Sequence, residues 1–260
     1  MEPLLTYRSV EVSFNGRAVT HDVSFTLHAG EILGIVGESG SGKSTLLKAA
    51  MGLLGNGGLV TKGDIWFKGK DLPDLPEKEL RKICGAGIGM IFQDAGAFLC
   101  PIRTIGEQIY ESMSAHMEIT RSQAREKALV LFEKLQFKDG QRIWNSYPFE
   151  LSGGMNQRAG IAIAMLKEPP VLLADEPTSA LDVAVQKQVI EEMLHLRELF
   201  GTAIILVTHD IGVVSAMADT VLVLKDGRIM EFGTAQQVLR EPRDAYTRKL
   251  LAAVPKLRRA

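Results

Sequence analysis

The sequence predicts an α/β fold, with a small antiparallel sheet near the N-terminus and a helical insertion in the middle of the chain. Three observations predict it: early alternation of apolar and polar residues, short apolar runs followed by helical segments, and helical periodicity over about 104–166. The length of 260 residues fits one large domain, or one domain with a built-in subdomain. Lys and Arg (30) balance Asp and Glu (31), and 6% of residues are aromatic, so nothing favours a nucleic-acid-binding face.

The first elements are strands. Residues 4–14 and 18–27 alternate apolar and polar side chains, which predicts antiparallel strands joined by a turn at Asn15-Gly16. Residues 31–36 are almost continuously apolar, which fits a buried parallel strand. We further expect a helix through 45–51 and strands at 64–67 and 87–92.

Helical periodicity then dominates. Apolar residues recur at helical spacing in two segments, and each set should form the buried face of a helix. The two sets are Ile105, Ile109 and Met113, and Ala124, Ala128, Leu131, Phe132 and Leu135.

Strands and helices alternate again after the insertion. We expect strands at 171–174 and 203–207 and helices at 182–200 and 211–218. Asp226-Gly227 lies between apolar runs and predicts a type I′ hairpin, and residues 234–251 should be helical.

Membrane and export signals are not expected. No apolar run approaches the roughly 18–20 residues that span a bilayer. The N-terminus begins acidic and lacks a basic segment followed by an apolar one, so we expect no signal peptide.

Residues 37–44 read GESGSGKS and match G-x-x-x-x-G-K-[ST], between a buried strand and a helix. Such a loop curls backbone N–H groups around phosphate oxygens, and the helix directs its positive end at them. Lys43 should reach the β- and γ-phosphates, and the Ser44 hydroxyl should ligate Mg²⁺. The candidate nucleotide-binding residues here are Gly37, Ser39, Gly40, Ser41, Gly42, Lys43, Ser44 and Thr45.

Asp175 and Glu176 follow four apolar residues. This places Asp175 at the end of a buried strand, where its carboxylate can hold Mg²⁺, while Glu176 can polarise an attacking water. Taken alone, the pair could equally be an acidic turn that caps a helix.

Residues 151–158 read LSGGMNQR and predict a helix start. Ser152 suits the N-cap, and Gly153 and Gly154 expose backbone N–H groups there. The segment is either a simple helix cap or a second phosphate contact.

Together these motifs resemble ABC-type ATPase cassettes, a family of P-loop NTPases, over essentially the whole chain. They occur in the family's order: the loop at 37–44, Gln93, LSGG at 151–154, Asp175-Glu176, SALD at 179–182 and THD at 208–210. The resemblance implies a RecA-like core with the antiparallel β-subdomain (1–92 and 168–233), an α-helical subdomain (93–167) and a helical tail (234–260), all within one domain of 1–260.

The resemblance also implies a mechanism. Two cassettes pack head to tail, and ATP lies between the phosphate loop of one and the LSGG of the other. Gln93 contacts Mg²⁺ and the attacking water, His209 contacts the γ-phosphate, and Asp182 communicates across the dimer. Phe14 should stack on adenine, with Tyr7 as a weaker candidate.

Three local features resemble the peptide/nickel uptake branch of the family: the TIGEQI at 104–109, the YPFE at 147–150 and the PRDAYTRKL at 242–250. The chain departs from the branch at Ala95, Cys100 and Asn156, and at Asp244-Ala245, where His-Pro is usual. We also expect no Cys-rich C-terminal extension of the kind that many peptide-type cassettes carry, because no cysteine follows Cys100 in the sequence.

The resemblance therefore implies an ATPase that energises an importer for peptides or for nickel and other metal chelates. Its expected partners are a second, paralogous cassette, two separate membrane permeases and, through the complex, an extracytoplasmic binding protein, at the cytoplasmic face of the membrane. The alternatives are an exporter cassette, a soluble ABC ATPase acting on DNA or ribosomes, and a degenerate cassette that does not hydrolyse ATP.

Overall fold

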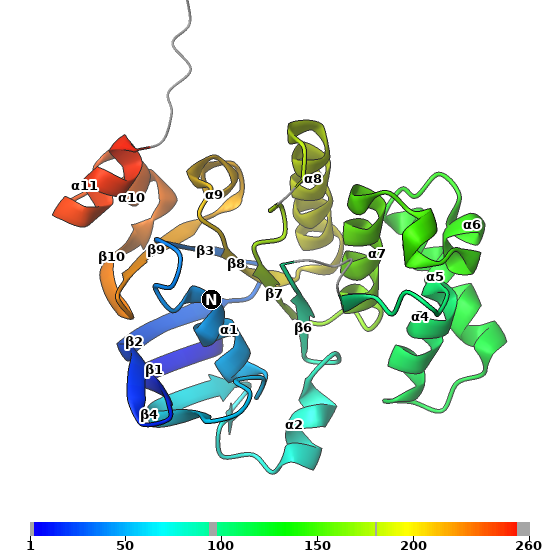
Figure 1. The fold of residues 1–260 in the computed structure, drawn as a ribbon, viewed down its shortest axis with the longest axis horizontal. Coiled ribbons are helices and arrows are strands. Elements are labelled where there is room, and N and C mark those ends of the chain that lie inside the picture. The colour runs from blue at the N-terminus through cyan, green and yellow to red at the C-terminus, as the bar shows by residue number, and fades with distance from the viewer. Residues whose placement is uncertain (1–2, 94–97, 180, 254–260) are drawn as a thin grey trace, which may run out of the picture. The chain divides into compact units, whose positions relative to one another are not determined.

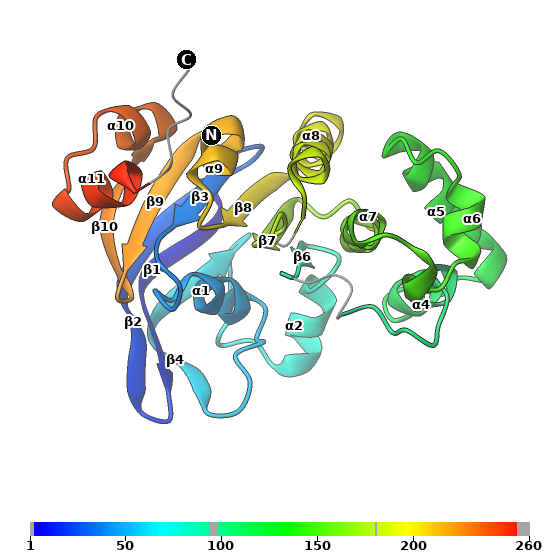
Figure 2. The same ribbon diagram turned by 45° about the horizontal axis from the view of Figure 1, so that its top comes forward.

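The computed structural model describes residues 3–93, 98–179 and 181–253. It divides into two compact units, Met1–Leu80 with Ala203–Ala260, and Arg81–Thr202. Each unit is described by itself, and Figures 1 and 2 show their elements. The expected boundaries of the helical subdomain at 93 and 167 remain a prediction, and Ala95 and Ala180 lie outside the described residues.

An antiparallel sheet forms part of the first unit. Its strands are β1 (Pro3–Phe14), β2 (Arg17–His28), β4 (Gly58–Phe67) and β5 (Lys70–Asp71), in the order β2-β1-β4-β5. Asn15 and Gly16, where the turn was predicted, both have positive φ, at 49° and 79°, as in a type I′ turn.

The strand expected at 64–67 is longer than predicted. It begins at Gly58, because β4 pairs along the whole of β1, from Phe14 opposite Gly58 to Leu5 opposite Phe67. The first half of β4 is mostly exposed, so no apolar alternation marked it in the sequence.

The second sheet of this unit contains β10 (Arg228–Thr234), β9 (Thr220–Lys225), β3 (Ile32–Val36) and β8 (Ala203–Val207), in that order. β3 runs parallel to both β8 and β9, and every residue of β3 and β8 is buried. The predicted parallel core strands are therefore confirmed.

Four helices accompany these strands in the described part of the unit. They are α1 (Lys43–Ala50), α9 (Ile211–Met217), α10 (Ala235–Arg240) and α11 (Ala245–Ala252). The tail is thus helical as predicted but broken at Pro242, since proline lacks the N–H that a helix interior needs.

The second unit combines a parallel strand pair with helices. β6 (Ile88–Ile91) and β7 (Val171–Asp175) are fully buried and pair in register. The helices are α4 (Ile105–Ser114), α5 (Arg121–Lys134), α6 (Gly140–Asn145), the short 3₁₀ helix η1 (Pro148–Glu150), α7 (Gly153–Met165) and α8 (Val183–Phe200). The helix α2 (Glu77–Ile83) belongs to both units, because the division between them falls after Leu80.

The predicted helix faces are confirmed. All eight apolar residues assigned to the inner faces of α4 and α5, including Leu135 just after α5, are buried. Thr104 and Thr120 begin these helices with capping boxes. Among the described helices, none is both long and apolar enough to cross a membrane.

Candidate functional site

The phosphate loop connects β3 to α1 in the first unit. Gly40 and Gly42 have φ values of 80° and 99°, in the region that favours glycine. Gly42 is the N-cap of α1 and offers no side chain to cap the helix. Because no side chain caps this helix start by a hydrogen bond, its positive end suits an anion.

Lys43 lies inside the loop. Lys43 is 5% exposed, and its Nζ donates to the carbonyl oxygens of Gly37 (2.8 Å) and Glu38 (2.9 Å). The hydroxyl of Ser41 is buried, and no described group forms a hydrogen bond with it. A buried ammonium and an unsatisfied hydroxyl in one glycine-rich loop fit phosphate oxygens as ligands.

The β9–β10 turn supports the loop from outside. The N–H of Gly227 donates to the carbonyl of Ser41 (3.0 Å), and its own carbonyl accepts from the N–H of His21 (2.8 Å). A Cβ on Gly227 would lie 2.1 Å from the Val19 carbonyl oxygen, so only glycine fits. At Gly37 a Cβ would lie 2.0 Å from the carbonyl oxygen of Leu224, so the loop and the strand β9 are in close contact.

The two aromatic candidates have different environments. Phe14 is the last residue of β1 and is half-buried; its ring lies so close to Gly58 that a Cβ there would be 2.7 Å from it. Tyr7 is a core residue: it is 1% exposed, its hydroxyl donates to the Leu46 carbonyl (2.8 Å), and its ring stacks on Phe25. The alternative that Tyr7 stacks on adenine is therefore wrong, because its ring faces other side chains.

His209 lies at the carboxyl end of the core strand β8. It is exposed, two residues after the strand ends. Asp210 follows it and caps α9 by accepting from the N–H groups of Gly212 (2.7 Å) and Val213 (3.4 Å). The cap fixes the backbone beside His209 and leaves its imidazole at the surface of the first unit.

The acidic pair lies in the second unit. Asp175 is the last residue of β7 and is 5% exposed, as predicted. Glu176 is half-buried and has a φ of 46°, which is strained for a residue with a Cβ. The two adjacent carboxylates thus differ in burial, which suits different roles for them.

Gln93 is connected to this pair within the same unit. The Ser179 hydroxyl lies 3.3 Å from the Gln93 carbonyl and 3.0 Å from the Glu176 carbonyl, and can donate to either. The structure therefore brings the predicted Gln93 and Glu176 segments together through Ser179. Ser179 was not among the predicted site residues, and the sequence signal that could have indicated it is its place in the SALD motif.

The LSGG segment forms the start of α7. Ser152 is the N-cap, as predicted, and its hydroxyl accepts from the Met155 N–H (3.3 Å). Nothing lies within 4 Å of a Cβ placed on Gly153, whereas Gly154 is in close contact with Val185 of α8. Ser152 and Gly153 are both exposed, so the start of α7 is accessible, as a second phosphate contact requires.

Asp182 caps the neighbouring helix α8. Its carboxylate accepts from the N–H groups of Ala184 and Val185, both at 3.0 Å. Since Val185 also touches Gly154, the unit holds Asp182 and the LSGG helix start in a common arrangement.

A buried ion pair links the same two helices. Arg158 of LSGGMNQR donates from Nε to Oε2 of Glu192 on α8 (2.8 Å) and from a terminal nitrogen to the Leu135 carbonyl (2.6 Å). Its guanidinium lies 4.2 Å from the centre of the Phe137 ring. Burial raises the pKa of Glu192 to about 7, against the lowering effect of Arg158. The sequence did not reveal this pair, because its residues are 34 positions apart.

The donor set expected for Mg²⁺ consists of oxygen atoms: the Ser44 hydroxyl, the Gln93 amide oxygen and the Asp175 carboxylate. Within the described ranges, no group of three or more His, Cys, Asp or Glu residues could hold a metal by itself. Mg²⁺ is typically held by one or two carboxylates together with waters and substrate phosphates, so this set fits that ion.

Comparisons with known proteins agree with these features. A family model described as "ABC transporter" matches residues 20–179. The oligopeptide transport ATP-binding protein OppD of Haemophilus influenzae is 43% identical over 99% of this chain and 80% of its own. The dipeptide transport ATP-binding protein DppD of Bacillus subtilis is 42% identical over 99% and 78%. A dimeric, post-hydrolysis structure of the ATP-binding cassette MJ0796 bound to ADP and Pi superposes with a TM-score of 0.77, at 29% identity over 89% of this chain and 99% of that one.

Proposed function

The chain belongs to the ABC transporter family and is an ATPase with the fold of an ABC cassette, and on that premise we propose that it energises an importer for peptides. The phosphate loop carries the proposal, since Lys43 and the orphaned Ser41 hydroxyl lie within it beside an uncapped helix start. OppD and DppD are named as oligopeptide and dipeptide transport proteins, which supports peptides as the substrate class.

We assign the charge-binding role to the first unit. Lys43 would exchange the carbonyls of Gly37 and Glu38 for phosphate oxygens, and the N–H groups at the start of α1 would bind the same anion. His209 would contact the γ-phosphate from the end of β8. Phe14 would stack on the adenine, since its half-buried ring is the remaining aromatic candidate.

We assign proton transfer and metal binding to the second unit, with Ser44 of the first. Glu176 would accept the proton of the attacking water, and Gln93 would orient that water. Asp175, Gln93 and Ser44 would hold Mg²⁺. When bound, this ion supplies positive charge that offsets the negative charge of the phosphates.

We propose that two cassettes act as a head-to-tail pair. The exposed helix start at Ser152 and Gly153, with nothing near Gly153, supports a contact with the nucleotide of a second cassette. The dimeric state of the MJ0796 structure supports a pair of cassettes. The partner would be a paralogous cassette, and both would attach to two permeases at the cytoplasmic face of the membrane.

Reconstitution tests this proposal. The chain would be co-expressed with a candidate second cassette and two candidate permeases and placed in proteoliposomes with a candidate binding protein. We expect ATP-dependent uptake of a labelled peptide that stops in the Glu176→Gln variant. Uptake of a nickel chelate but not of peptides would show that peptides are the wrong substrate class. Failure to associate with any permease would contradict the importer role.

A further inference from the structure

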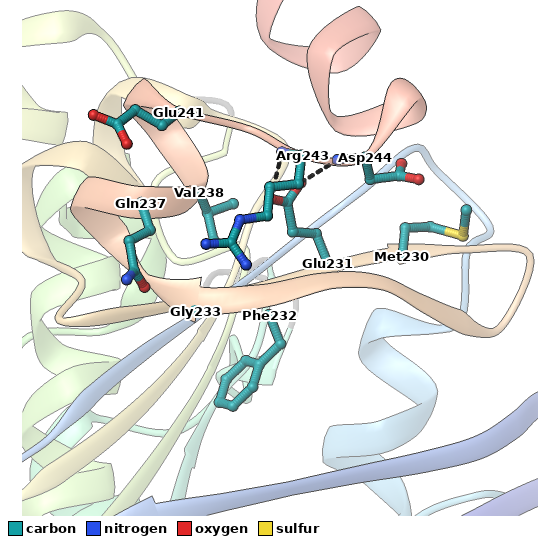
Figure 3. Close-up of a pocket in the computed structure, with 9 residues that line it drawn as sticks. All are labelled: Met230, Glu231, Phe232, Gly233, Gln237, Val238, Glu241, Arg243 and Asp244. Atoms are coloured by element: carbon teal, nitrogen blue, oxygen red, sulfur yellow. Dashed lines mark hydrogen bonds between the residues drawn. The ribbon is translucent and has the colours of Figure 1, made fainter.

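A chain of hydrogen bonds in the first unit begins on β10 and ends at the phosphate loop. Its first member is Glu231, whose two carboxylate oxygens accept from the backbone N–H groups of Arg243 (2.8 Å) and Asp244 (3.1 Å). Figure 3 shows the Glu231 side chain reaching these two residues. These bonds attach the segment before α11 to the strand β10.

The same segment borders a cavity of about 410 Å³ between β10 and α10 (Figure 3). On that side the segment faces a hollow instead of packed side chains. The two bonds to Glu231 therefore matter more for its position than hydrogen bonds in a well-packed region would. They also hold the pKa of Glu231 below its usual range, against the raising effect of burial, so Glu231 stays a carboxylate.

Asp244 passes this position on to α11. Its carboxylate accepts from the N–H groups of Tyr246 (2.8 Å) and Thr247 (3.2 Å), which caps the helix. Thr247 is 1% exposed, so the first turn of α11 is fixed by packing as well as by the cap. The direction of the Tyr246 side chain follows from this turn.

Tyr246 reaches the phosphate loop. Its hydroxyl accepts from the backbone N–H of Glu38 (3.3 Å), and the Lys225 ammonium lies 4.8 Å from its ring centre. The carbonyl of the same Glu38 accepts from Lys43 (2.9 Å) and from the N–H of Ser41 (3.2 Å). Tyr246 thus bonds to the N–H of Glu38, and the carbonyl of Glu38 bonds to Lys43, the expected phosphate-binding lysine.

We propose that Tyr246 is a positioning residue for the phosphate loop, held in place by Glu231 through Asp244. The inference rests on the proposed role of the loop in binding ATP. When Lys43 leaves the carbonyls of Gly37 and Glu38 for phosphate oxygens, the bond from Tyr246 keeps the Glu38 backbone in its bound position. Without that bond the loop is less ordered before ATP binds, and the free energy of ordering it reduces the affinity for ATP. The loss therefore raises KM and leaves kcat nearly unchanged.

The first test removes one hydroxyl. Tyr246→Phe keeps the ring beside Lys225 and deletes the acceptor for Glu38. We expect KM for ATP to rise about 2- to 10-fold, the range of one net hydrogen bond, with kcat changed less than about twofold and the melting temperature unchanged. Tyr110→Phe is the matched control, because it removes a phenol hydroxyl from another half-buried tyrosine, on α4 of the other unit.

The second test removes the first member of this series of hydrogen bonds, Glu231. Glu231→Ala leaves every loop residue intact, and we expect KM to rise in the same direction. Because both residues act through the same series of hydrogen bonds, the free-energy change from KM in the double variant Glu231→Ala/Tyr246→Phe should be smaller than the sum of the changes in the two single variants. An unchanged KM in Tyr246→Phe overturns the proposal, as does a parallel loss of kcat and melting temperature, which marks a merely structural role.

A separate control keeps this inference distinct from the proposed function. If Lys43→Ala binds ATP as tightly as the wild-type chain, the assignment of the loop itself fails. If Lys43→Ala loses ATP and Tyr246→Phe matches the wild type, the loop assignment stands and only the role of Tyr246 is refuted.

Discussion

Nε of Arg158 donates to Oε2 of Glu192 across 2.8 Å, and the two side chains are only 8% and 4% exposed. The bond joins α7, which begins with the LSGG segment, to α8, which is capped by Asp182. The second oxygen of Glu192, Oε1, is buried, and no described group forms a hydrogen bond with it. The pair therefore depends on a single contact, and both partners are sensitive to substitution.

Arg158→Met should destabilise the chain by about 3–5 kcal/mol, because it leaves the Glu192 carboxylate buried without its partner. Urea-induced unfolding measures the change. Lys187→Met is the matched control: its ion pair with Glu191 is exposed on both sides, and its loss should cost about 0–1 kcal/mol. Equal losses of unfolding free energy in the two variants would show that the buried pair contributes no more to stability than the exposed one.

The stability of the chain should depend on pH through Glu192. Its pKa is about 7 in the folded chain and ordinary in the unfolded chain, so between these values the folded state holds a proton that the unfolded state has released. Stability therefore falls as pH rises through this window, by at most about 1.4 kcal/mol per pH unit, and levels off above it. Unfolding measured from pH 5 to pH 8 should show this fall relative to Glu192→Gln. Parallel curves for the two proteins would refute it.

Glu176→Gln should keep ATP binding and lose turnover, since the amide cannot accept the proton of the attacking water. Single-turnover hydrolysis and equilibrium ATP binding separate the two effects. The variant should also accumulate as a closed dimer in ATP, which size-exclusion chromatography detects. Hydrolysis near the wild-type rate would show that another group is the base.

Phe14→Ala should weaken ATP binding by about 1–3 kcal/mol, the range of base stacking on an aromatic side chain in nucleic-acid sites. Tyr7→Phe should leave ATP affinity unchanged, because the Tyr7 ring is enclosed in the core and its hydroxyl bonds to the Leu46 carbonyl. Fluorescence titration with an ATP analogue compares them. An unchanged affinity in Phe14→Ala would remove this residue from the site.

The sequence predicted best the elements whose local pattern decides their structure. The apolar run at 203–207 became β8 with the same bounds, and the Asn15-Gly16 turn has the backbone that its residues favour. The glycine-rich loop could be assigned because its residue types and spacing are local.

What the sequence could not show depends on contacts between distant positions. The exposed half of β4 forms a strand because β1 offers backbone partners, and Tyr7 is excluded from adenine stacking because Phe25 and α1 enclose it. The approach of Tyr246 to Glu38 joins positions 208 residues apart, and no spacing rule indicates it.

Gly227 limits where this chain can tolerate added length. Turns between strands are common places for insertions, tags and circular permutation. The Asp226-Gly227 turn differs, because its backbone bonds to both the phosphate loop and β2. A peptide inserted there would disconnect the loop from its support. Both residues of the Lys68-Gly69 turn also have positive φ, and a Cβ on Gly69 would meet nothing within 4 Å, so this turn is the better site for an epitope or a fluorescent label.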